Sequence, residues 1–181
     1  MILGKDNIER LPPPVGTSDW ATFSRRAYCV DKTLMIKDLI DSETTVALFT
    51  RPRRFGKTTA MEMIRAFYEG DAALFHDKQI WAAGEQYRAE QGAHPVIFLT
   101  FKDVKQQTTE EAFTRLAAIV GGEVARFAES VRGGLNDEAK RESLDRVMKR
   151  KGSRDELAES LGLLAEAIEV HSGKKPVILI D

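Results

Sequence analysis

The stretch from residue 44 to residue 70 constrains the fold more than any other part of the sequence. It opens with TTVALFT (44–50), an uncharged run with β-branched residues that predicts a buried strand. From Lys57 onward, apolar side chains recur at helical spacing as far as Gly70, so this segment predicts a helix. The loop between them, RPRRFGK, concentrates cations: Arg51, Arg53, Arg54 and Lys57. Because like charges repel and lose hydration beside a buried strand, the loop is expected to bind an anion.

Two further apolar runs have the length and composition of buried strands. One is HPVIFLTF (94–101), which a proline introduces, and the other is PVILID (176–181). Helical patterns separate the three runs. Strands that alternate with helices predict an α/β fold, with a parallel sheet, flanking helices and right-handed crossovers.

Caps and apolar spacing mark the helices. Residues 1–30, which include three consecutive prolines, are expected to form a lead-in segment before a domain over 31–181. Asp31 is expected to cap the first helix, and Thr108 and Glu111 have capping-box spacing. The predicted helices are at about 32–41, 57–69, 108–131 and 137–150, with one more after KGSRDE. Those after residue 105 are expected to form a helical insertion over about 105–173.

Composition excludes several classes of protein. The 27 basic and 28 acidic residues give a net charge of -1, so no global basic field holds nucleic acid. A single cysteine, Cys29, cannot form an internal disulfide, and no apolar run approaches the roughly 20 residues that cross a bilayer. The three histidines are scattered, so no zinc site is expected. With no leader pattern at the N-terminus, the expected location is the cytoplasm.

The cationic loop has the chemistry of a phosphate-binding loop. In such a loop, backbone N–H groups and a helix N-terminus face the phosphates, a lysine reaches the outer phosphates, and a hydroxyl binds Mg²⁺. Lys57 and Thr58 take the last two roles, and Lys57 is the expected catalytic residue. The expected nucleotide-binding residues are Arg53, Arg54, Phe55, Gly56, Lys57, Thr58 and Thr59. The first glycine of the full motif is absent, because Arg51 stands there.

A second element of the same site is expected at the C-terminal run. VILID is four apolar residues followed by an acid, as in the strand that carries the second Mg²⁺ ligand of nucleoside triphosphatases. Asp181 is that acid, so Thr58 and Asp181 are the expected metal ligands. The fold prediction is accordingly a P-loop NTPase-like sheet, and the predicted cofactors are ATP and Mg²⁺.

Four segments together resemble the bacterial predicted AAA-ATPase-like family: YCVDKTLMIKDLI, FTRPRRFGKTTAMEMI, HPVIFLTF and PVILID. The resemblance spans residues from about 11 to 181. It implies an ATPase in the complete members, with Gly56, Lys57 and Thr58 at the phosphates and Mg²⁺. In that family the arginine-rich loop is the usual form, and a restriction-nuclease-like domain often follows. Asp31 and Lys32 fall in a family motif whose role the sequence does not supply, and a helix cap beside a solvated lysine is an equal interpretation.

The sequence departs from the family pattern after Asp181. The glutamate that follows this acid in the family is absent, as are further strands, so the sheet is expected to be incomplete at its C-terminal end. If the sheet order resembles that of related ATPases, one missing strand belongs between the loop strand and the Asp181 strand. Hydrolysis by this chain alone is not expected. Two alternatives stay open: a nucleic-acid-associated module that uses the arginine cluster, and a non-enzymatic remnant of a longer ATPase.

Overall fold

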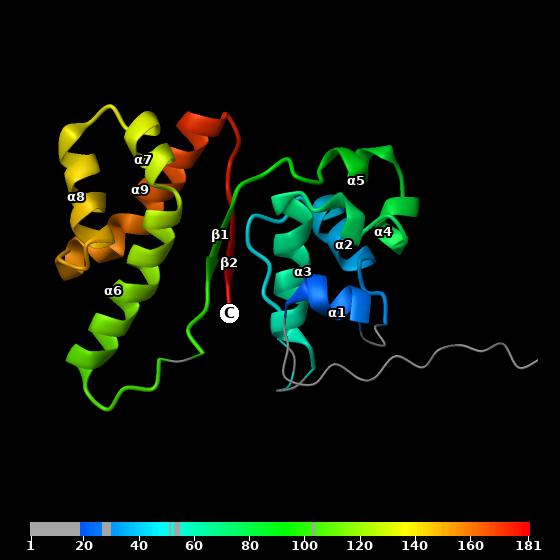
Figure 1. Ribbon diagram of the computed structural model, residues 1–181, viewed down its shortest axis with the longest axis horizontal. Coiled ribbons are helices and arrows are strands. Elements are labelled where there is room, and N and C mark those ends of the chain that lie inside the picture. Colours follow the sequence, from blue (N-terminus) through cyan, green and yellow to red (C-terminus); the bar gives the residue numbers. More distant parts are fainter. Residues whose placement is uncertain (1–18, 27–29, 51, 53–54, 103) are drawn as a thin grey trace, which may run out of the picture. The chain divides into compact units, whose positions relative to one another are not determined.

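The computed structural model describes residues 19–26, 30–50, 52, 55–102 and 104–181. The chain divides into two compact units (Figure 1). The first contains the residues up to Phe67 together with Asp71–Arg88, and the second contains Tyr68–Gly70 together with Ala89–Asp181. Each unit has its own buried side chains and is described by itself.

Short helices build the first unit around an aromatic core. Its elements are α1 (Trp20–Arg26), α2 (Leu34–Asp41), α3 (Lys57–Glu69, ending in the second unit), η1 (Ala72–Leu74), α4 (Gln79–Ala82) and α5 (Glu85–Ala89). Phe75 is central to the core. It stacks on Trp20 with 6.0 Å between ring centroids and meets Phe67 edge-on at 5.4 Å. The helix predictions over 32–41 and from Lys57 to Gly70 are confirmed, and Gly70 ends α3 at a positive φ of 98°.

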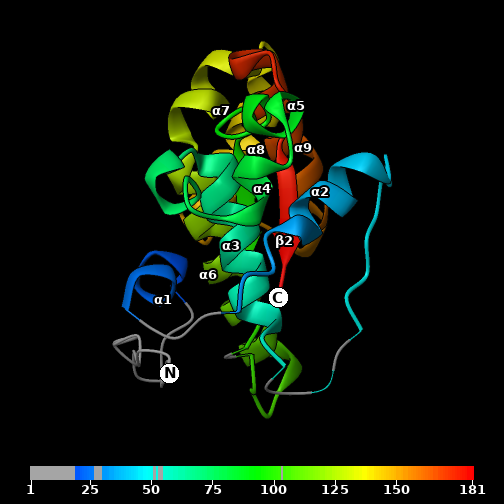
Figure 2. The ribbon, with the colours of Figure 1, turned by 90° about the vertical axis from the view of Figure 1, so that its right-hand side faces the viewer.

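The predicted buried strand at 44–50 is wrong. The segment is extended but irregular, and the side chains of Val46 and Leu48 are 80% and 84% exposed. Figure 2 shows it as a plain trace between α2 and α3. An isolated strand leaves its N–H and C=O groups without ladder partners. Within the described residues the two strands pair with each other, and neither pairs with this segment.

The second unit contains a parallel pair of strands. β1 (Val96–Leu99) and β2 (Val177–Ile180) align residue by residue, from Val96 opposite Val177 to Leu99 opposite Ile180. Main-chain hydrogen bonds continue past the strand ends, because Phe101 N donates to Asp181 O at 2.8 Å. The two strand predictions and the parallel arrangement are confirmed.

Four helices of the second unit form a layer against one face of the strands (Figure 1). They are α6 (Thr109–Arg126), α7 (Ala128–Gly134), α8 (Glu138–Met148) and α9 (Arg154–Ser172). Ile97 and Leu99 of β1 join the core of this layer. Caps fix where two of the helices begin. The Thr108 side chain accepts from Glu111 N at 3.2 Å, and Ser153 and Glu156 form a complete capping box.

The expectation of one long helix to residue 131 is wrong. The helix stops at Phe127, whose φ of -104° and ψ of 26° leave the helical region, and α7 starts in a new direction. Packing explains the break, because α7 lies very close to α9. A Cβ on Gly134 would stand 1.9 Å from the carbonyl oxygen of Ala167. Only a glycine permits this approach.

Candidate functional site

The N-terminus of α3 is the best formed part of the predicted phosphate-binding loop. Gly56 precedes the helix with a φ of 74°, and its carbonyl oxygen accepts the first helical hydrogen bond from Ala60 N at 2.9 Å. Nothing lies within 4 Å of the position that a Cβ on Gly56 would occupy. The backbone therefore needs glycine for its left-handed conformation, and it keeps an open face beside the helix start.

Lys57, Thr58 and Thr59 form the first turn of α3, and all three are half-buried. The first turn carries the positive end of the helix dipole, and its N–H groups point along the axis away from the helix. The 13-residue helix contains no acidic side chain in this turn. The turn is therefore suited to an anion. Phe55, one residue before Gly56, is exposed.

The arginines of the loop lie outside the described residues. This holds for Arg51, Arg53 and Arg54, so their contribution to an anion site stays a prediction. Cys29 also lies outside the described residues.

Asp181 directly follows β2 and is held by its backbone on both sides. Its N–H donates to Leu99 O at 2.9 Å, and its carbonyl accepts from Phe101. The carboxylate is largely buried and forms an ion pair with Lys102 at 3.3 Å. The lysine compensates the charge that burial would otherwise disfavour. Asp181 thus offers a fixed carboxylate at the end of a parallel strand, where open α/β sheets place their ligand-binding residues.

No cluster of three or more histidine, cysteine or acidic side chains that could hold a metal occurs among the described residues. Mg²⁺ does not require such a cluster, because it usually binds one or two protein oxygens, several waters and the phosphates of its nucleotide. The hydroxyl of Thr58 and the carboxylate of Asp181 are donors of the kind that Mg²⁺ prefers. Among the helices that the structure describes, none is long and apolar enough to span a bilayer.

Asp31 has a structural role that its predicted capping role only partly captures. The α2 cap position is Thr33, two residues further on, and Asp31 accepts from Thr33 N at 2.8 Å and from its hydroxyl at 2.7 Å. The other carboxylate oxygen accepts from Gln79 N at 2.7 Å, and the Thr33 hydroxyl accepts from Ile80 N at 3.1 Å. The two side chains therefore join the start of α2 to the start of α4.

Sequence reasoning missed Thr33, which is fully buried. The signal was the spacing of an aspartate and a threonine two residues apart, which is typical of a side-chain turn. Lys32 lies between them and is exposed, as the solvated-lysine interpretation expected.

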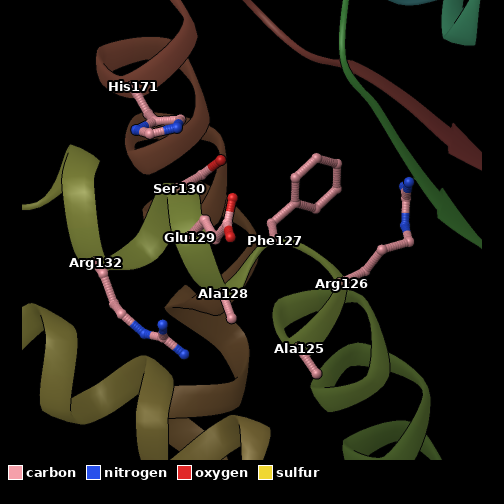
Figure 3. A pocket seen from close by; sticks show the side chains of 8 residues that line it. All are labelled: Ala125, Arg126, Phe127, Ala128, Glu129, Ser130, Arg132 and His171. Carbon is pink, nitrogen blue, oxygen red and sulfur yellow. The ribbon is translucent and has the colours of Figure 1, made fainter.

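A separate open cavity of about 500 Å³ lies in the second unit where α6 meets α7 (Figure 3). Its lining contains none of the predicted site residues: Ala125, Arg126, Phe127, Ala128, Glu129, Ser130, Arg132 and His171. Figure 3 shows the side chains of Arg126 and Arg132 pointing to opposite sides. Because the two guanidinium groups point apart, they are not arranged to bind one ligand in this cavity.

Comparison with known proteins shows which family the chain belongs to. No curated protein and no solved structure matches the chain. A family model described as predicted AAA-ATPase does match, over residues 14–181, and it includes the cationic loop, α3 and both strands. This family supports a nucleotide-binding, ATPase-like module. With nearly its whole length covered by that model, the chain belongs to the AAA-ATPase-like family of predicted AAA-ATPases.

Proposed function

We propose that the chain binds ATP with Mg²⁺ through the loop and first helical turn at residues 51–59. The observation that carries the proposal is the geometry at Gly56. A left-handed glycine with open space around it leads directly into the Lys57 turn of a long helix. A triphosphate is the ligand that this combination fits, because it is strongly anionic and approaches the backbone closely.

Each residue of the turn has a distinct role in this proposal. The main chain from Arg53 to Thr58 surrounds the phosphates, and the Lys57 ammonium neutralises the outer ones. The Thr58 hydroxyl and the Asp181 carboxylate are the protein ligands of Mg²⁺, which shields the phosphate charges. Arg51, Arg53 and Arg54 add positive potential, which attracts the nucleotide and strengthens its binding.

Calorimetric titration of the full chain with ATP and Mg²⁺ tests the proposal. We expect saturable binding that Lys57→Ala weakens at least about tenfold, which is about 1.4 kcal/mol. Lys105→Ala is the matched control, because it removes an exposed lysine from the segment between β1 and α6. Circular dichroism checks that each variant is folded. A folded protein that does not bind ATP, or that binds it equally well without Lys57, contradicts the proposal.

The metal ligands need their own measurement. Titrating Mg²⁺ at fixed ATP compares the metal dependence of the protein with that of Thr58→Val and Asp181→Asn. We expect both variants to need more Mg²⁺ for the same ATP affinity, while their affinity without metal changes little. If neither variant alters the metal dependence, Thr58 and Asp181 are not ligands of Mg²⁺, and the nucleotide alone binds the metal.

A further inference from the structure

The ion pair between Asp181 and Lys102 lies within the second unit and joins a fixed group to a movable one. Asp181 is the fixed group, because its N–H donates to Leu99 O at 2.9 Å and its carbonyl accepts from Phe101 N at 2.8 Å. Its side chain is 10% exposed, and one carboxylate oxygen lies 3.3 Å from the ammonium of Lys102. Withdrawing a carboxylate from water is unfavourable unless a partner compensates its charge. The position of Asp181 therefore calls for a cation.

Lys102 supplies that cation from a side chain that can move. The side chain is 49% exposed, in contrast to the neighbouring Phe101, which packs against the core of the helical layer. A lysine carries its ammonium on a flexible four-carbon stem, and the ammonium is strongly hydrated when it is released. Lys102 can therefore leave the carboxylate of Asp181 without any change in the packing of the core.

The ammonium of Lys102 competes with the metal that Asp181 is proposed to bind. Both cations need the same carboxylate oxygens, and two positive charges a few ångströms apart repel each other. The ion pair with Lys102 therefore opposes metal binding at Asp181. The same pair also shields the negative charge of Asp181, which would otherwise repel the phosphates of a nucleotide that arrives without metal.

We propose that Lys102 is a built-in counter-ion of Asp181 that sets how much Mg²⁺ the nucleotide site requires. Lys102 neutralises the carboxylate while no metal is bound, and it releases the carboxylate when Mg²⁺ accompanies ATP. The inference rests on the function proposed above, because it concerns the metal ligand of the same site. Its consequence is that the charge of Lys102 lowers the response of ATP binding to Mg²⁺ and supports the binding of ATP without metal.

Calorimetric titration of the full chain with ATP, repeated at a series of Mg²⁺ concentrations, tests this role. We expect Lys102→Met to reach half of its Mg²⁺-dependent gain in ATP affinity at about threefold lower Mg²⁺, since a partly exposed ion pair contributes modestly. Its affinity for ATP without metal is expected to fall. Lys105→Ala is the matched control, because it removes an exposed lysine three residues away, and it is expected to behave like the unmodified protein. Circular dichroism checks that each variant is folded.

Two further variants separate this role from a general effect of charge. Lys102→Arg keeps the positive charge, so it is expected to need at least as much Mg²⁺ as the unmodified protein. In the Asp181→Asn background, Lys102→Met is expected to change the Mg²⁺ requirement no further, because the carboxylate through which the lysine acts is gone.

The possible failures of the two proposals are distinct. If folded Lys102→Met binds ATP with an unchanged Mg²⁺ requirement, the role of Lys102 is overturned and the ATP site stands. An equal shift in the Asp181→Asn background also overturns the role, since the lysine would then act on the nucleotide directly. If the folded, unmodified protein does not bind ATP at any Mg²⁺ concentration, both proposals are overturned.

Discussion

Asp31 and Gln79 are 48 residues apart in the sequence, yet the carboxylate of Asp31 accepts a hydrogen bond from the Gln79 amide at 2.7 Å. Together with the buried Thr33 hydroxyl, this bond fixes α2 against the start of α4. It gives a physical reason for an aspartate and a threonine on either side of an exposed lysine. The motif stabilises the first unit, and the unit in turn carries the nucleotide-binding turn proposed at α3.

Replacing Asp31 by alanine is expected to destabilise the protein by about 1–3 kcal/mol, because partly buried amides lose a charged acceptor. Lys32→Ala, which removes an exposed side chain, is expected to change the free energy of unfolding by less than about 0.5 kcal/mol. Urea unfolding of the two variants at neutral pH measures the difference. Equal stability of the two would show that water replaces the Asp31 bonds at no cost.

The same residue predicts a dependence of stability on pH. Partial burial alone would raise the pKa of Asp31, but hydrogen bonds from Thr33 and Gln79 and the nearby Lys78 outweigh it and lower the pKa below 3.8. The unfolded chain therefore takes up this proton first as pH falls. The contribution of Asp31 is complete above about pH 4 and is lost as pH falls through the folded-state pKa. Comparing acid unfolding of the protein with that of Asp31→Asn isolates this contribution, which the variant lacks.

Burial raises the pKa of Tyr68 above 10.0, and the charge of Glu90 adds to the effect. The phenol of the unfolded chain ionises first, so the folded state loses stability as pH rises above about 10. Tyr68→Phe is expected to reduce this loss. Absorbance at alkaline pH, which reports phenolate formation, and unfolding curves at pH 9 and pH 11 provide the measurements. An identical alkaline loss in the variant would assign the effect to other groups.

Substitutions at Gly56 can distinguish two reasons for a glycine at this position. One is the left-handed backbone conformation, and the other is space for a ligand close to the backbone. Gly56→Ala is expected to cost about 1–2 kcal/mol, because alanine disfavours a φ of 74°, whereas asparagine tolerates it better. Because the protein leaves the Cβ position open, Gly56→Asn is expected to fold nearly normally. If phosphates approach this backbone, both variants lose ATP affinity. Normal ATP binding by folded Gly56→Asn would exclude close contact at Gly56.

Two adjacent glycines of α6 are expected to respond in opposite directions. A Cβ on Gly121 would lie 2.6 Å from the carbonyl oxygen of Val147, whereas Gly122 has nothing within 4 Å. Gly121→Ala is therefore expected to destabilise by roughly 1–3 kcal/mol through overpacking. Gly122→Ala is expected to stabilise by about 0.5–1 kcal/mol, because alanine favours the helix. Thermal unfolding distinguishes the two, and similar effects would contradict this packing of α6 on α8.

The elements that could be predicted from the sequence are those whose signals are local. The strands around Ile97 and Leu179 and the cap at Thr108 depend on short patterns, and the structure contains them. The first turn of α3 was also predictable, because a glycine and the start of an apolar helical stripe define it. Each of these features is determined by residues that lie within a few positions of one another in the sequence.

Features that depend on distant partners could not be predicted in the same way. The run at 44–50 has strand composition but no neighbouring strand among the described residues, and α6 bends at Phe127 because Gly134 packs against Ala167. The pairing of Asp31 with Gln79 likewise joins segments that no local pattern connects. Composition reports a preference for a conformation, and long-range contacts decide whether the preference is met.

The exposed run at 44–50 also has a consequence for handling the protein. TTVALFT is uncharged, contains no proline or glycine and has high β-propensity, which is the composition of segments that seed cross-β fibrils. Glu43 and Arg51 flank it with opposite charges, in the positions of gatekeeper residues that slow such stacking. Neutralising these two charges is therefore expected to favour such stacking.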